Sequence, residues 1–219
     1  MAAISLGETS ALQYSVIGQD ASGIGDMKHV GMLSGDCREL LRDQEVFVFE
    51  MGPPLNLDDS ARKMIAHAVG FLDVPTDGFT DVQKRIALWL AEIRTRGVRC
   101  DYRVLPATQS TIDSETRRAQ YQSFSCAGFV ATCYRDGAGV SLVVDEAGLP
   151  EVERALTEQI WGRQYMHCAK ATRDKLMDRF GLSGPGPWQV LLPGYLLHAL
   201  NQARSALPYT PGQPDWKFP

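Results

Sequence analysis

The stretch "SFSCAGFVATCY", residues 123–134, places Cys126 at the start of a run of small and apolar residues. This run predicts a helix that ends near Asp136–Gly137. A cysteine at a helix N-terminus feels the positive end of the helix dipole, which lowers the pKa of the thiol and favours the reactive thiolate. Gly128, one turn inside the helix, leaves room for another segment to approach closely. A free cysteine is also a common buried packing residue, so the role of Cys126 depends on whether a histidine reaches it.

The chain contains four histidines, and one of them differs from the others in its setting. His67, His167 and His198 fall in segments with helical patterns, where we expect packing or surface roles. His29 stands in "KHVGMLSGD" (28–36), at the beginning of a short predicted strand. His29 is therefore the candidate partner of Cys126.

A stronger strand is predicted over "QEVFVFEMG" (44–52), and it carries Glu50. If the two strands pair antiparallel with Leu33 opposite Val46, Glu50 falls opposite His29, with Cβ atoms about 5 Å apart. A carboxylate there would orient the imidazole, and the imidazole would activate the cysteine.

Two further groups bear on the same site. Asp26 lies close to His29 in the sequence and is an alternative to Glu50 as the orienting residue, although its setting is more typical of a turn. The backbone N–H of Cys126 points out of the first helical turn, where it is a natural donor to an oxyanion.

These residues carry a family resemblance. "SCAGFV" (125–130) resembles the nucleophile helix of NlpC/P60-type papain-like cysteine hydrolases, where the pattern is usually Asp-Cys-Ser-Gly-Leu/Phe-Val. "HVGMLSGD" (29–36) resembles the histidine strand of that superfamily, typically His-Val-Gly-Ile-Tyr followed by a glycine-containing turn. The histidine precedes the cysteine here. That order resembles the circularly permuted branch, which includes YiiX-like proteins, lecithin:retinol acyltransferase-like proteins and the PPPDE peptidases.

The resemblance implies a papain-like cysteine hydrolase or acyltransferase that acts through a thioester acyl-enzyme. Cys126 would be the nucleophile, His29 the base and Glu50 the orienting residue. Substrates would be amides, such as cell-wall peptides or protein isopeptide bonds, or lipid esters. Ser125 and Ala127 stand where Asp and Ser are usual in the family, which leaves one contact of the site open.

The standard order, with the histidine after the cysteine, has a weaker match. "LLPGYLLHAL" (191–200) faintly resembles the Pro-Gly-Asp-Leu element that precedes the histidine in that arrangement. Tyr195 replaces the Asp, and His198 follows too soon and within a helical pattern. His167 lies on the right side of Cys126 in the chain but in unsuitable surroundings.

The overall pattern predicts an α+β fold in one domain, residues 1–219, with residues 53–122 as a possible helical insertion or lid. The resemblance implies a small antiparallel sheet packed on the nucleophile helix, in permuted topology and with extra helices. Strands are expected over 11–18, 28–33, 44–52, 139–144 and near Tyr102–Leu105 of a polar, irregular segment (98–122). Helices are expected over 57–72, 82–93, 126–137, 150–161, 164–180 and 193–205.

The composition narrows the partners. A net charge of −4 and a pI near 5.6 do not indicate the basic surface that binds nucleic acid. The chain contains no run of about 18 apolar residues, so we expect no transmembrane segment. The five cysteines match no disulfide framework or zinc signature, so we expect no metal and no cofactor. The N-terminus does not resemble a secretory signal peptide.

We therefore expect the protein to be made in the cytoplasm. An enzyme that cuts the cell wall would then need export without a signal peptide, as a toxin or effector. Such an effector would have an immunity or regulatory protein as its partner. The alternative is a module of the same fold that is not catalytic and binds a partner or lipid. Catalysis predicts an accessible, unusually reactive Cys126, and the binding module predicts an ordinary thiol there.

Overall fold

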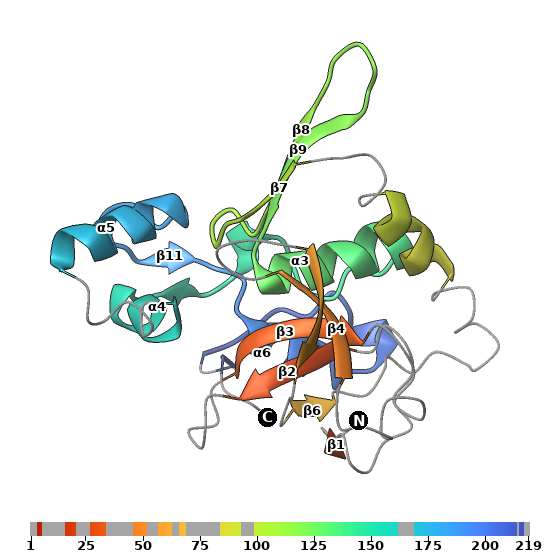
Figure 1. The fold of residues 1–219 in the computed structure, drawn as a ribbon. Helices are drawn as coiled ribbons and strands as arrows, with labels where there is room; N and C mark the ends of the chain where they lie inside the picture. Colours follow the sequence, from red (N-terminus) through yellow and green to blue (C-terminus); the bar gives the residue numbers. More distant parts are fainter. Residues whose placement is uncertain are drawn as a thin grey trace.

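The fold was analysed in a computed structural model, which describes residues 4–5, 16–20, 27–33, 46–51, 57–62, 66–68, 84–92, 99–161, 169–213 and 215–216. These residues form three sheets and several helices (Figure 1). The predicted α+β class is confirmed. None of the described helices combines the length and the apolar composition that a membrane crossing requires.

The largest sheet has six strands in the order β1-β6-β2-β3-β4-β5, and every neighbouring pair is antiparallel. The strands predicted around His29 and Glu50 are confirmed as β3 and β4, and the strand predicted over 11–18 lies slightly later, as β2. The bounds are β1 Ile4–Ser5, β2 Val16–Asp20, β3 Met27–Leu33, β4 Val46–Met51, β5 Leu57–Arg62 and β6 Ala66–Ala68.

The helix predicted over 57–72 is wrong, because this segment supplies β5 and β6 to the sheet. β5 pairs with the whole of β4, from Met51 opposite Leu57 to Val46 opposite Arg62. Pairing with a neighbouring strand overrides a local helical pattern. The helical insertion over 53–122 is therefore wrong for its first part. Further along, the structure contains a helix over residues 84–92, which confirms the one predicted over 82–93.

A second sheet arises from the segment predicted to be irregular. β7 (Arg99–Tyr102), β9 (Ala119–Phe124) and β8 (Thr108–Ile112) lie in the order β7-β9-β8, with β7 parallel to β9 and β8 antiparallel to it. The β8–β9 hairpin projects away from the rest of the structure (Figure 1). Its side chains are mostly exposed, so these strands lack the apolar alternation that would have revealed them.

The predicted cysteine helix is confirmed as α3 (Cys126–Thr132), which continues as a π-helical turn over Cys133–Gly137. α3 packs against β3, β4 and α6 (Pro193–Leu200). On its flank, the ring of Trp89 lies 6.2 Å from that of Phe129 and 6.4 Å from that of Phe124, measured between centroids. These contacts fix the helix within the main hydrophobic core.

The helices predicted over 150–161 and 164–180 are confirmed in part as α4 and α5, residues 164–168 lie outside the described residues, and a pair of short strands was not predicted. α4 spans Arg154–Trp161 and α5 spans Lys170–Arg179, and β10 (Glu151–Val152) pairs with β11 (Trp188–Gln189). The strand predicted over 139–144 is wrong: its only ladder pairing in the described structure is an isolated bridge between Val143 and Tyr209. That bridge holds the C-terminal segment against the body.

Candidate functional site

The N-terminus of α3 is fixed by Ser125. The backbone of Ser125 is extended, its Oγ accepts the backbone N–H of Gly128 at 2.9 Å, and its carbonyl accepts that of Phe129 at 2.9 Å. This is the geometry of a helix N-cap. Ser125 thus performs the capping that an Asp at this position would perform, and a serine directly before an apolar run was the signal for it in the sequence.

Gly128 meets the segment before β8 at close range, as the sequence predicted. A Cβ atom built on Gly128 would lie 1.9 Å from the carbonyl oxygen of Ala107. The same carbonyl accepts the backbone N–H of Ser125 at 2.9 Å, and the backbone N–H of Ala107 donates to the carboxylate of Glu146. A chain of hydrogen bonds therefore runs from Glu146 through Ala107 to the cap of α3. Nothing in the sequence indicated the part played by Glu146.

Cys126 is the first residue of α3, and its sulfur lies against β3. Burial raises the pKa of the Cys126 thiol, but a hydrogen bond from the His29 side chain, the charge of His29 and backbone hydrogen bonds from Val30 and Ala127 lower it, and the net pKa lies below the ordinary value. The structure therefore brings together the two residues that the sequence paired, Cys126 and His29.

Cys133, one helical heptad after Cys126, shows what burial alone does. It is fully buried on the same helix, and burial together with the charge of Asp136 raises the pKa of its thiol well above the ordinary value. The difference between the two thiols follows from the groups around Cys126, because both side chains are shielded from water.

The access to Cys126 differs from what a catalytic role predicts. Its side chain is only 1 % exposed, while His29 is half-buried. A catalytic role would therefore require the groups that cover the sulfur to move.

Glu50 occupies a different register position from the one assumed. Leu33 pairs with Val48 instead of Val46, so Glu50 lies opposite Gly31 and not opposite His29. The shift is two residues, which keeps Glu50 on the face of the sheet that carries His29, at a diagonal position about 7–8 Å away by strand geometry. The side chain of Glu50 lies outside the described structure.

Another residue takes the position directly across from His29. Gln19 of β2 pairs with His29 on the strand's other side. The predicted strand ended at residue 18, one position before Gln19, and sequence reasoning missed it for that reason. The register alone places Gln19 there, since its side chain lies outside the described structure.

The other candidates lie elsewhere. Asp26 and His167 are outside the described residues, and His67 is in β6 with its side chain outside the description. His198 is in α6, where its ring stacks on Tyr209 with centroids 6.1 Å apart. Among the described side chains, no group of His, Cys, Asp and Glu is arranged to hold a metal ion.

No protein-family model matches the chain, and neither the curated proteins nor the solved structures include one with detectable similarity to it.

Proposed function

We propose that this protein is a papain-like cysteine hydrolase or acyltransferase of permuted topology, which cleaves an amide or ester bond through a thioester on Cys126. One observation carries the proposal: the His29 side chain on β3 hydrogen-bonds the sulfur of Cys126 at the first position of α3. An imidazole paired with a thiol at a helix N-terminus is the arrangement that nucleophilic cysteine catalysis requires.

The reaction proceeds in two halves. His29 takes the thiol proton, and the thiolate of Cys126 attacks the carbonyl carbon, whose π electrons move to the oxygen. The tetrahedral intermediate collapses to a thioester, and the leaving amine or alcohol receives the proton from His29. Water or another acceptor then gives a proton to His29, attacks the thioester and releases the acyl group, with the proton returned to the Cys126 sulfur.

Three backbone groups assist the charged species. The N–H groups of Val30 and Ala127 hydrogen-bond the Cys126 sulfur, so they stabilise the thiolate before attack. The N–H of Cys126 lies at the first position of α3, where helical geometry leaves it available to the oxyanion. Glu50, or Gln19 across the other edge of β3, is the candidate to orient the imidazole.

The fold is compatible with the proposed family. A helix that begins with the cysteine packs against an antiparallel sheet, and the histidine strand β3 precedes that helix in the chain. This is the order expected of the permuted branch.

The test is turnover of three substrate classes: a peptidoglycan fragment, an isopeptide-linked protein pair and a phospholipid ester. We expect the wild type to cleave one class, Cys126→Ala to lose the activity, and the matched control His198→Gln to keep it. Cleavage that persists in Cys126→Ala, or no cleavage of any class by the wild type, would refute the proposal.

The second candidate is a module that binds a partner or lipid without catalysis. The observation that favours it is the 1 % exposure of the Cys126 side chain. In such a module the His29–Cys126 contact would stabilise the core. The wild type would then show no turnover, and Cys126→Ala would only lower the melting temperature.

A further inference from the structure

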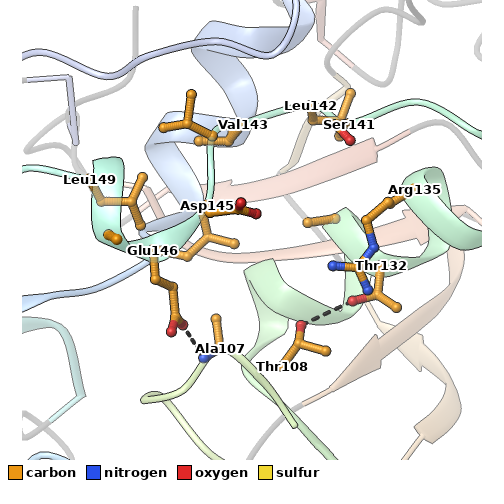
Figure 2. Close-up of a pocket in the computed structure, with 14 residues that line it drawn as sticks. Ala107, Thr108, Thr132, Arg135, Ser141, Leu142, Val143, Asp145, Glu146 and Leu149 are labelled. Carbon is orange, nitrogen blue, oxygen red and sulfur yellow. Dashed lines mark hydrogen bonds between the residues drawn. The ribbon is translucent and has the colours of Figure 1, made fainter. Parts of the chain in front are cut away.

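A pocket of about 380 Å³ lies beside α3 (Figure 2). Ala131 and Thr132 of α3 line it, and at 3.6 residues per turn they project from the opposite side of the helix to Cys126. Small-molecule pockets commonly enclose about 300–1,000 Å³, so this one has room for a metabolite. Its lining does not include Cys126, His29 or Glu50.

The pocket carries opposite charges on opposite walls. Arg135 extends into it from the π-helical turn that follows α3, and Asp145 extends into it from the facing loop (Figure 2). The charge of Asp145 is near enough to contribute to the raised pKa of Arg135, after the larger effect of its hydrogen bond to Asp136. Among the described residues the ion pair of Arg135 is with Asp136, at 2.6 Å, and none joins it to Asp145. A ligand can therefore lie between the two charges.

The floor and the remaining walls combine hydroxyl groups with apolar side chains. The hydroxyls of Thr108 and Thr132 hydrogen-bond one another at 3.0 Å at the base of the pocket (Figure 2). Glu146 at the edge is held by the backbone N–H of Ala107. The apolar lining includes Leu142, Val143, Val144, Leu149 and Leu191, with three alanines. The ligand that fits this lining has two opposite charges and an apolar body.

We propose that this pocket binds a free amino acid with an apolar side chain, its carboxylate on Arg135 and its ammonium group on Asp145. Asp136 accepts hydrogen bonds from Nε and Nη2 of Arg135, which leaves the terminal N–H groups that face away from Asp136 to donate to the ligand carboxylate. The apolar side chain of the ligand fills the space lined by leucine and valine. The proposal does not rest on the proposed function of Cys126, because none of the groups involved takes part in that chemistry.

The test is a titration of the full chain with L-leucine by isothermal calorimetry at about pH 7, where the ligand is zwitterionic. Isoamylamine and isocaproate are the single-charge controls, since each keeps the apolar body and only one charged group. Arg135→Gln and Asp145→Asn each remove one charge from an exposed side chain and are expected to fold. Glu151→Gln is the matched control, an exposed carboxylate that does not line the pocket.

We expect saturable binding of L-leucine to the wild type and to Glu151→Gln, and at least about tenfold weaker binding to Arg135→Gln and Asp145→Asn. The two single-charge compounds are expected to bind the wild type at least about tenfold more weakly than L-leucine. Absence of L-leucine binding, equal binding of either single-charge compound, or undiminished binding by both charge variants would each overturn the proposal.

Discussion

His29→Gln is expected to raise the pKa of the Cys126 thiol. In the wild type, burial raises this pKa, and a hydrogen bond from His29 together with the charge of His29 leads the effects that lower it. Glutamine keeps a similar volume and a donor group but removes the charge. A hydrogen bond to a charged group contributes about 1.5–3 kcal/mol and an ordinary one about 0.5–1.5 kcal/mol, so we expect the loss of the charge to cost the thiolate about 1–1.5 kcal/mol and the pKa to rise.

The assay is the pH dependence of iodoacetamide alkylation, with each labelled cysteine located by mass spectrometry. The midpoint of the profile is the quantity compared, because an opening step that exposes the buried sulfur scales the rate at every pH alike. Cys133, which is buried on the same helix with a raised pKa, serves as the internal reference. His198→Gln is the matched control, since its ring stacks on Tyr209.

We expect the alkylation midpoint of Cys126 to lie below that of Cys133 in the wild type and in His198→Gln. It should rise only in His29→Gln. An unchanged midpoint in His29→Gln would refute it. A wild-type midpoint for Cys126 as high as that for Cys133 would refute it as well.

Three further predictions concern the stability of the fold. Gly128→Ala places a Cβ atom against the carbonyl of Ala107 and should destabilise the fold by about 1–3 kcal/mol in urea titration; an unchanged midpoint would contradict the close packing. Ser125→Ala removes the cap of α3 and should cost about 0.5–2 kcal/mol, while Ser125→Thr should retain most of the stability, and equal losses would argue against a capping role. Partial burial raises the pKa of Asp215, but the hydrogen bond from Tyr209 helps lower it below 3.8. The hydrogen bond between Tyr209 and ionised Asp215 stabilises the fold above that pH, and this stabilisation is lost as the pH falls through the lower pKa that Asp215 has in the folded protein. Tyr209→Phe should therefore lower the melting temperature more at neutral pH than in acid. A loss that does not depend on pH would exclude this linkage.

The elements around the site could be predicted because their patterns are local. The residues after Cys126 form a run of small and apolar side chains, and the strand that holds Glu50 is rich in β-branched and aromatic residues. The pairing of His29 with Cys126 followed from residue chemistry, because few histidines were available and only His29 lay in a predicted strand.

The elements that the sequence failed to predict depend on partners distant in the chain. β5 and β6 have a helical pattern but pair with β4 and β2, and the polar strands β8 and β9 pair with each other as an exposed hairpin. Local periodicity contains no information about such partners.

The register between β3 and β4 had the same limitation. Both the assumed pairing and the observed one place Glu50 on the face that carries His29, so the alternation of side chains could not distinguish them. The burial of Cys126 was equally hidden, since it results from packing of α3 against the sheet and α6.

Capture of the acyl-enzyme is the most direct test of the proposal that Cys126 is a nucleophile. The protein is mixed with p-nitrophenyl butyrate at neutral pH, quenched in acid, and mapped by peptide mass spectrometry. We expect one butyryl group on Cys126 of the wild type, which is lost on longer incubation. It should be absent from Cys126→Ala and should form more slowly in His29→Gln. Butyrylation of Cys100 or of other side chains while Cys126 stays unmodified would contradict it.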